Sequence, residues 1–265
     1  MKKYGFIGAG KMAGAIVKGL LKGAAKPEDI VCACGNDDTG KNLALQTGIQ
    51  CAASAAEIIG GAEIIVLACK PQQLTEAAKA AAGAKNRLLL SILAGTPISR
   101  LRECFAGVAK IVRVMPNMPA QISQGISCYA PETPLTDGEK RDAETILSAI
   151  GEFMQVEESR LDAVTALSGS GPGYLFEFAA ALIEGAQKIG FSREEAVRLV
   201  NKTLLGSAML LAQSPLTADE LCAAVSSPGG TTLAGLAEMQ KAGFRKTVEN
   251  VLKSSKKRSE ELSKL

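Results

Sequence analysis

The first half of the chain alternates short apolar runs, each about as long as a buried strand, with segments that have helical periodicity. Near-continuous apolarity is typical of parallel strands, because helices cover both of their faces. The helical segments between the runs supply the crossover connections that parallel strands need. The alternation predicts a doubly wound, mostly parallel α/β sheet with the strands YGFIGAG, DIVCACG, AEIIVLAC, RLLLSILAG and AKIVRVMPN, and with GISCYAP and GEFMQV at one edge.

The character of the sequence changes after Val156, where strand-like runs stop and long helical patterns begin. We therefore expect residues 1–157 to form the sheet domain and residues 158–265 to form an all-helical domain. The capping-box spacing, in which a hydroxyl and a carboxylate satisfy each other's backbone amides, predicts helix starts at Ser192 with Glu195 and at Thr217 with Glu220. The closing run KSSKKRSEELSKL has mixed charge and predicts a solvated helix end.

The helical part is rich in alanine and glycine, notably in FEFAAALIEGAQKIG and TLLGSAMLLA. Small residues let helices approach closely, and a small domain with this much apolar surface often completes its core with a second copy. The sequence therefore predicts a homo-oligomer. The glycines of SGSGPGY, where the character changes, are best explained by close helix packing.

The charge balance excludes several kinds of partner. The formal net charge of +3 comes from 30 Lys and Arg against 27 Asp and Glu, which is too balanced for a nucleic acid or an anionic membrane. No segment reaches the about 20 apolar residues of a membrane span, and MKKYGFIGAG has glycines where a leader would have a long apolar run. We expect a cytoplasmic protein that acts on a small molecule.

The chain has seven cysteines without CxxC spacing and no histidine. Scattered cysteines are typical of reduced, buried thiols, and zinc usually recruits histidine or closely spaced cysteine, so we expect no metal site. The absence of histidine also excludes every catalytic triad and every hydride transfer that depends on an imidazole.

A GxGxxA fingerprint stands at the end of the first predicted strand and opens a helix. Gly8 permits the tight turn, Gly10 lets a pyrophosphate approach the backbone, and Ala13 lets helix and strand pack. The helix N-terminus favours the anion. The position in the first βαβ unit favours dinucleotide binding over a plain glycine-rich turn, and adds Ala9, Lys11 and Met12 to the predicted cofactor contacts.

Three further loops follow predicted parallel strands, and ligands of such sheets bind beyond the carboxyl ends of the strands. Each loop has the alternative of being a plain strand-to-helix connection. Lys70 favours binding in the first loop, because a cation there suits ribose, phosphate or an acidic substrate. The predicted contacts are Ala68, Lys70 and Pro71 in ACKPQ; Leu93, Ala94 and Gly95 in LAG; and Met115, Pro116 and Asn117 in MPN.

The end of the second strand bears on the choice of cofactor. An acid that grips the ribose 2'-hydroxyl is expected there, yet the sequence has Cys34, Gly35 and Asn36. Asn36 could donate to a 2'-phosphate, whereas Asp37 and Asp38 could favour NAD. We expect NADP, with NADPH preferred and NADH possible.

The run SSPGGTT, residues 226–232, lies between two helical patterns. Its turn residues could expose backbone amides to an anion, and Thr231 and Thr232 add hydroxyls at a helix start. The alternative is an ordinary interhelical turn, because glycine and proline punctuate most connections for geometric reasons.

Taken in order, GFIGAGKMA, ACKPQ, VRVMPNMPA, ALSGSGPGY and VSSPGGTTLAGL resemble the pyrroline-5-carboxylate reductase family nearly from end to end. The resemblance implies a Rossmann domain, an all-α dimerisation domain, and reduction of 1-pyrroline-5-carboxylate to L-proline by NAD(P)H, the last step of proline biosynthesis. It implies that SSPGGTT holds the substrate carboxylate, through Ser226, Ser227, Gly230, Thr231 and Thr232.

The resemblance also fits the missing histidine, because a protonated cyclic imine accepts hydride without a strong protein acid. Thr232 matches the position of the hydroxyl that is expected to bond the ring nitrogen. Glu158 is a second candidate, a carboxylate that could favour the iminium charge, and its alternative is a solvated hinge residue.

Three other functions stay open on the residues alone. A β-hydroxyacid dehydrogenase would need a catalytic lysine in the interdomain helix, and LSGSGPGYLFEFAAALIEGAQ has none before Lys188. A broader imine reductase differs only in the shape of its pocket. A redox sensor or scaffold would need no substrate site.

Overall fold

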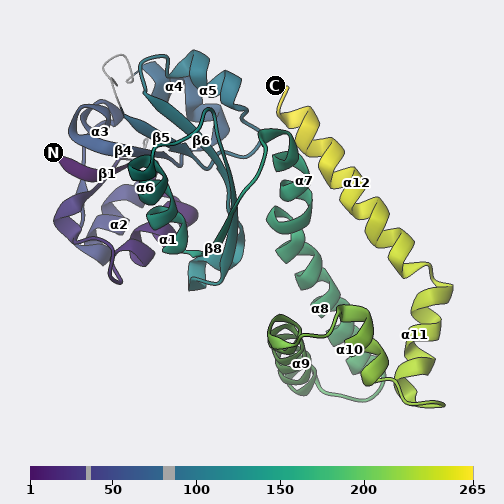
Figure 1. Ribbon diagram of the computed structural model, residues 1–265. Coiled ribbons are helices and arrows are strands. Elements are labelled where there is room, and N and C mark those ends of the chain that lie inside the picture. The colour runs from purple at the N-terminus through teal and green to yellow at the C-terminus, as the bar shows by residue number, and fades with distance from the viewer. Residues whose placement is uncertain (34–36, 80–86, 265) are drawn as a thin grey trace. The chain divides into compact units, whose positions relative to one another are not determined.

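The computed structural model describes residues 1–33, 37–79 and 87–264 (Figure 1). The chain forms two compact units. Unit 1 is Met1–Ser170 with Ser255–Leu265, and unit 2 is Gly171–Ser254. The predicted domain boundary between residues 157 and 158 falls at the short helix η5 (Glu158–Arg160) inside unit 1, and it stays a prediction.

Unit 1 is built on an eight-stranded sheet in the order β3-β2-β1-β4-β5-β6-β7-β8. The pairs from β3 to β6 are parallel, β7 is antiparallel to β6, and β8 is parallel to β7. The predicted doubly wound sheet is confirmed, with β7 and β8 at one edge. The strands are β1 (Lys2–Ile7), β2 (Ile30–Ala33), β3 (Gln50–Cys51), β4 (Ala62–Leu67), β5 (Leu88–Ser91), β6 (Lys110–Met115), β7 (Gly125–Pro131) and β8 (Gly151–Gln155).

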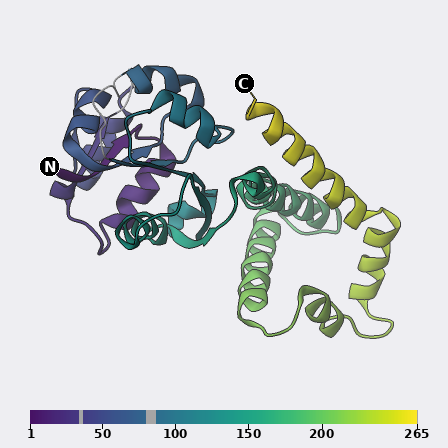
Figure 2. The same cartoon turned by 45° about the horizontal axis from the view of Figure 1, so that its top comes forward.

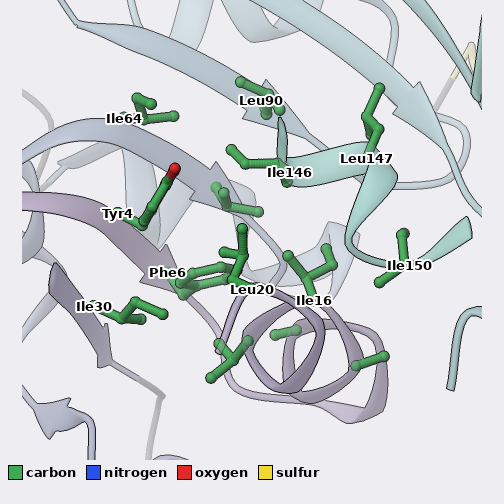
Figure 3. Packing of buried hydrophobic residues seen from close by; sticks show 14 of the residues in the cluster. Tyr4, Phe6, Ile16, Leu20, Ile30, Ile64, Leu90, Ile146, Leu147 and Ile150 are labelled. Carbon is green, nitrogen blue, oxygen red and sulfur yellow. The ribbon is translucent and has the colours of Figure 1, made fainter. Parts of the chain in front are cut away.

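Buried side chains form a separate core on each face of this sheet. On β1, Tyr4 and Phe6 point to one core, and Ile7 belongs to the other, as the alternation of a strand requires. Figure 3 shows Phe6 against Ile16 and Leu20 of α1. The helices of unit 1 are α1 (Lys11–Leu20), α2 (Thr39–Thr47), α3 (Ala55–Gly61), α4 (Leu74–Lys79), α5 (Ile98–Cys104), α6 (Asp137–Ser148) and α7 (Leu161–Val164).

Unit 2 consists of helices and connecting loops, as both views show (Figures 1 and 2). The predicted capping boxes are confirmed: Glu195 N donates to Ser192 Oγ at 3.3 Å, and Glu220 N donates to Thr217 Oγ1 at 3.3 Å. No helix in the described part of the chain is both long and apolar enough for a bilayer crossing. The helices are α8 (Gly171–Lys188), α9 (Arg193–Gln213), α10 (Ala218–Ala224), α11 (Thr231–Lys241) and α12 (Phe244–Leu262), of which α12 ends in unit 1.

The end of α12 differs from its prediction. We expected a solvated helix end, but Ser259 is buried and donates to Asp162 Oδ1 at 2.6 Å. Ser263, one turn later, donates to the same oxygen at 3.3 Å. The charged residues of the run are exposed or partly exposed, and Arg258 pairs with Glu261 at 3.0 Å. A pattern of mixed charge therefore described the exposed face only.

A bidentate ion pair ties α5 to the segment after β7. Arg102 Nε donates to Glu132 Oε1 at 2.9 Å, and Arg102 Nη2 donates to Glu132 Oε2 at 2.5 Å. Arg102 Nη1 also donates to the carbonyl of Val108 at 2.8 Å. The hydrogen bonds from Arg102 hold the pKa of Glu132 below its ordinary value. A lowered carboxyl pKa stabilises the folded state above the ordinary pKa of glutamate, about 4.3, and this contribution is lost as the pH falls through the lower folded-state pKa.

We therefore expect Glu132→Gln to lower the free energy of unfolding by about 1 kcal/mol at pH 7, because a charge-assisted pair becomes a neutral one. Urea unfolding at pH 7 and near pH 3 measures the difference, which should become smaller at the lower pH. Glu103→Gln is the control, since the Glu103 side chain is 65% exposed in its pair with Arg100. An equal loss at both pH values would contradict the electrostatic origin.

Candidate cofactor and substrate sites

The glycine loop lies where β1 ends between β2 and β4. Gly8 N donates to the carbonyl of Ala33 at 2.6 Å, and Ala68 N donates to the carbonyl of Ile7 at 2.8 Å. Gly8 has a φ of +101°, and a Cβ built there would lie 2.6 Å from the backbone of Ala68. No other residue type fits this position without moving the backbone.

Gly10 is the N-cap of α1, and no side chain caps this helix start. A Cβ built on Gly10 would meet nothing within 4 Å, so the backbone is open to a ligand on this side. Ala13 is buried, as the third position of the fingerprint requires. The first amides of α1 and the positive end of the helix can therefore receive a phosphate.

The other predicted cofactor loops follow β4, β5 and β6, which are adjacent parallel strands, so their carboxyl ends share one edge with β1. Lys70 is exposed and precedes the short helix η2 (Pro71–Gln73), and its backbone amide donates to Gln73 Oε1 at 3.1 Å. Leu93 is buried, Ala94 is exposed and Gly95 has a φ of +64°. The structure therefore brings Ala68, Lys70, Pro71, Leu93, Ala94 and Gly95 to the same edge as Gly8, Ala9, Gly10, Lys11 and Met12.

The MPN loop, with Met115, Pro116 and Asn117, is held from two sides. Asn117 Oδ1 accepts a hydrogen bond from the amide of Ile126 at 3.0 Å, which turns the NH₂ group of Asn117 away from Ile126. A Cβ built on Gly169 would lie 2.5 Å from Met115 Cε, so the glycine admits the methionine side chain. Gly169 is thus explained by close packing, whereas nothing lies within 4 Å of a Cβ built on Gly171 or Gly173.

The structure describes only some of the residues after β2 that are expected to decide between NADP and NAD. Cys34, Gly35 and Asn36 lie outside the described residues, so the prediction for Asn36 stays a prediction. Asp37 Oδ1 accepts hydrogen bonds from the amide and the hydroxyl of Thr39, and Asp38 pairs with Lys41 at 3.3 Å. Both carboxylates are thus engaged by the first turn of α2.

A cavity of about 370 Å³ lies between α1 and α2 beside the glycine loop. It adds polar residues that the fingerprint did not identify, although Lys11, Gly14 and Lys18 recur at helical spacing and lie on one face of α1. The lining includes Gly10, Lys11, Lys18, Thr39, Asn42 and Gln121.

Cys69, next to Lys70, is a thiol at this edge of the sheet. Burial raises the pKa of Cys69 to about 11. The side chain is therefore a neutral thiol near pH 7, and its chemistry is that of a packing residue rather than a nucleophile.

In unit 2, SSPGGTT forms the turn between α10 and α11. Gly229 has a φ of +72°, Gly230 is the N-cap of α11, and Gly230 N donates to the carbonyl of Ser227 at 2.9 Å. The predicted helix start at Thr231 and Thr232 is confirmed. No side chain caps α11, and its first turn has no acidic residue, so its amides are open to an anion. Ser226 Oγ instead donates to the carbonyl of Cys222 at 2.6 Å.

Glu158 is neither free nor fully solvated. Its Oε1 accepts hydrogen bonds from the amide of Ile98 at 2.7 Å and from Arg113 Nη1 at 3.2 Å. Arg113 is buried, with its side chain 7% exposed, and also lies 3.9 Å from Asp162. The carboxylate of Glu158 thus caps α5 and neutralises Arg113, two roles that sequence reasoning missed because the partners are far apart in the chain.

A parallel doubly wound sheet with an open glycine loop at the end of β1, joined to an all-α unit, defines the class of Rossmann-type NAD(P)-dependent oxidoreductases. Residues 3–95 match the family model described as "NADP oxidoreductase coenzyme F420-dependent", and residues 158–262 match "Pyrroline-5-carboxylate reductase dimerisation". The chain is 37% identical to the pyrroline-5-carboxylate reductase of Methanosarcina acetivorans over 99% of this chain and 98% of that one. It belongs to the pyrroline-5-carboxylate reductase family.

Solved structures agree with this assignment. The pyrroline-5-carboxylate reductase of Coxiella burnetii superposes with a TM-score of 0.91 at 28% identity, covering 100% of this chain and 99% of that one. The pyrroline carboxylate reductase of Plasmodium falciparum, solved with NADP bound, superposes with a TM-score of 0.86 at 29% identity, covering 99% and 98%. The resemblance and the fold inferred from the sequence are confirmed.

The two fingerprint glycines should respond differently to substitution. Gly8→Ala should destabilise the protein by about 1–3 kcal/mol, because the residue has a positive φ and its Cβ would meet backbone. Gly10→Val should melt close to the wild type, since a Cβ there meets nothing, yet it should weaken NADPH binding at least tenfold by blocking the approach of the phosphates. Thermal unfolding and NADPH titration measure both effects. Unchanged NADPH affinity in Gly10→Val would remove this loop from the cofactor site.

Proposed function

We propose that this protein reduces 1-pyrroline-5-carboxylate to L-proline with NADPH as the preferred hydride donor, and NADH as a possible one. The observation that carries the proposal is the open start of α11 in SSPGGTT, in a chain that is similar over 99% of its length to pyrroline-5-carboxylate reductases. The reaction is the last step of proline biosynthesis.

Unit 1 would hold the cofactor. The pyrophosphate would lie on the first amides of α1, reached over Gly10 with Lys11 beside it, because these groups are open and the helix end is positive. When bound, the nicotinamide supplies the hydride. The proposed contacts are Gly8, Ala9, Gly10, Lys11, Met12, Asn36, Ala68, Lys70, Pro71, Leu93, Ala94, Gly95, Met115, Pro116 and Asn117.

Unit 2 would hold the substrate carboxylate. The amides of Thr231 and Thr232 are the first of α11, and Gly230 brings no side chain between them and an anion. The hydroxyls of Ser227 and Thr231 are on exposed residues and can donate to the same carboxylate, with Ser226 behind them. A carboxylate at a helix N-terminus is stabilised by typically 0.3–1 kcal/mol through the dipole alone, before its hydrogen bonds.

For hydride transfer to the protonated imine, the main task of the protein is to orient the substrate and the nicotinamide. A protonated imine carbon accepts hydride directly, and holding two reacting centres in line can supply about 7–11 kcal/mol. The Thr232 hydroxyl, on a half-buried residue, would accept a hydrogen bond from the ring N–H and so fix which carbon faces the hydride donor. Glu158 as a second contact to the substrate stays a prediction, because its Oε1 already has two donors.

Assembly into a homodimer or higher homo-oligomer is supported by apolar residues of unit 2 that lie on the surface. On α8, Phe176 is 60% exposed, and on α9, Leu210 is 58% exposed. In α8 no residue is buried, although FEFAAALI is strongly apolar. A second copy covering these helices would bury side chains that one chain leaves in water. The scattered cysteines without CxxC spacing support the cytoplasmic location, which stays a prediction.

The activity is tested by incubating racemic 1-pyrroline-5-carboxylate with NADPH or NADH and following nicotinamide absorbance, with the product identified. Proline formation with either cofactor supports the proposal. Turnover of acyclic imines but not of the cyclic one would favour a broader imine reductase, and no turnover by protein that binds NADPH would contradict the proposal.

Thr232→Ala should lower kcat/KM for the imine by about ten- to a thousandfold and leave NADPH affinity unchanged, because only a hydrogen bond to the ring nitrogen is lost. Thr232→Ser keeps the hydroxyl and should retain most of the activity. Steady-state kinetics and NADPH titration give both readouts. Wild-type kinetics in Thr232→Ala would remove this residue from the mechanism.

Light scattering should give the wild type at least twice the mass of one chain. Leu210→Glu should lower this mass, because a carboxylate would enter the covered apolar surface, whereas Gln213→Glu, at an exposed polar position on the same helix, should not. A wild type with the mass of a single chain would contradict the oligomer.

A further inference from the structure

The loop between β5 and α5 is held by groups that lie outside it. Ile92 N donates to the carbonyl of Leu67 at 3.0 Å, and Leu93 is buried, which fixes the start of the loop. The end of the loop is Pro97, the N-cap of α5, whose side chain cannot cap the helix. Glu158 takes this role, since its Oε1 accepts from the amide of Ile98 at 2.7 Å. The part between these anchors, Ala94 and Gly95, is the proposed cofactor contact.

The last turn of α12 lies against the same loop. A Cβ built on Gly95 would be 3.1 Å from Leu262 Cβ and 3.5 Å from the carbonyl carbon of Leu262. Gly95 also has a φ of +64°, a conformation that favours glycine. The glycine therefore serves two purposes: it makes the turn, and it leaves room for the helix end.

A chain of polar contacts, in which Ser259 and Arg113 are buried, joins this helix end to the cap of α5. Ser259 and Ser263 of α12 donate to Asp162 Oδ1 at 2.6 and 3.3 Å. Asp162 lies 3.9 Å from Arg113 Nη2, and Arg113 Nη1 donates to Glu158 Oε1 at 3.2 Å. Figure 1 shows the C-terminal end of α12 beside α7, the helix that carries Asp162. Because the Arg113 side chain is only 7% exposed, loss of one carboxylate would leave a buried charge poorly paired.

We infer that the last turn of α12 is a positioning element for the cofactor loop after β5. Leu262 lies directly against Gly95, and Ser259 and Ser263 act on the same loop through Asp162, Arg113 and Glu158. The inference rests on the proposed function in one respect, namely that Ala94 and Gly95 contact NADPH. It makes Ser259, Asp162 and Glu158 positioning residues, which control cofactor affinity without touching the cofactor.

The consequence is a loss of NADPH affinity when the contact is removed. A loop that samples other conformations binds with an affinity reduced by the fraction in which it is competent, so a competent fraction of about one tenth gives a tenfold weaker Kd. We expect a chain ending at Arg258 to bind NADPH about tenfold or more weakly, and Ser259→Ala about threefold. Asp162→Asn keeps the acceptor for the serines but loses the charge that faces Arg113, so it separates the two halves of the network.

The measurements are the NADPH Kd by titration without substrate, the KM of each substrate with kcat, and thermal unfolding. Ser254→Ala, at an exposed position on the same helix, is the matched control and should bind NADPH as the wild type does. A positioning role raises the Kd and KM of NADPH by a larger factor than the KM of the imine. A general loss of stability would instead lower the folded fraction, and with it the apparent kcat, without a selective rise in the KM of NADPH.

Wild-type NADPH affinity in both the folded shortened chain and Ser259→Ala would overturn the inference. If the shortened chain does not fold, Ser259→Ala and Asp162→Asn decide the matter alone. Because NADPH binding is measured without the imine, a protein that binds NADPH more weakly in these variants but never forms proline would contradict the proposed function and leave the positioning role standing. Proline formation with unchanged NADPH affinity would do the reverse.

Discussion

The parallel pairing of β1 between β2 and β4 is the constraint on which the cofactor edge depends. It brings the chain after Ile7 between Ala33 and Ala68, and the backbone of Ala68 and Cys69 leaves no space for a side chain at Gly8. The turn that follows ends at Gly10, the N-cap of α1, where no side chain caps the first amides of the helix. Parallel pairing of β4, β5 and β6 then adds their loops to the same edge, so the topology of the sheet assembles a ligand site from four distant segments.

Two groups of helix starts in this protein differ chemically. Those of α3, α6, α9 and α10 are capped by the side chains of Ser54, Thr136, Ser192 and Thr217, and each has acidic residues in its first turn. Those of α1 and α11 have glycine at the N-cap, no side-chain cap and no acidic residue in the first turn. At a capped helix start the side chain already satisfies a backbone amide and the acidic residues already face the positive end of the helix. At α1 and α11 the first amides and the helix dipole remain available to stabilise an anion. The two anions of the proposed reaction, the pyrophosphate and the substrate carboxylate, match the starts of α1 and α11.

The sequence allowed prediction of the features that depend on neighbours in the chain. The fingerprint at Gly8 and Gly10, the capping boxes at Ser192 and Thr217, and the strands of the sheet were all local patterns, and the structure has them. The chain of polar contacts from Ser259 to Glu158 was not predictable in this way, because Ser259 and Asp162 are 97 residues apart. Ser259 and Ser263 stand among lysines and glutamates, so the sequence pattern did not indicate that their hydroxyls are hydrogen-bonded to Asp162. The end of the terminal helix was therefore expected to be solvated. The two-residue strand β3 is too short for any periodicity.

Unit 2 owes little of its stability to its own interior. Ala196 and Val200 are its only buried hydrophobic residues, and all of its residues are described. Helices as long as α8 and α9 need tertiary burial of an apolar face, because propensity alone leaves isolated helices marginal in water. In the proposed oligomer that burial comes from another copy, so folding of unit 2 and assembly become one equilibrium that depends on protein concentration. The open start of α11 belongs to this unit, and an anion site needs fixed amides. In this proposal substrate binding, unlike cofactor binding in the well-packed unit 1, would be coupled to assembly.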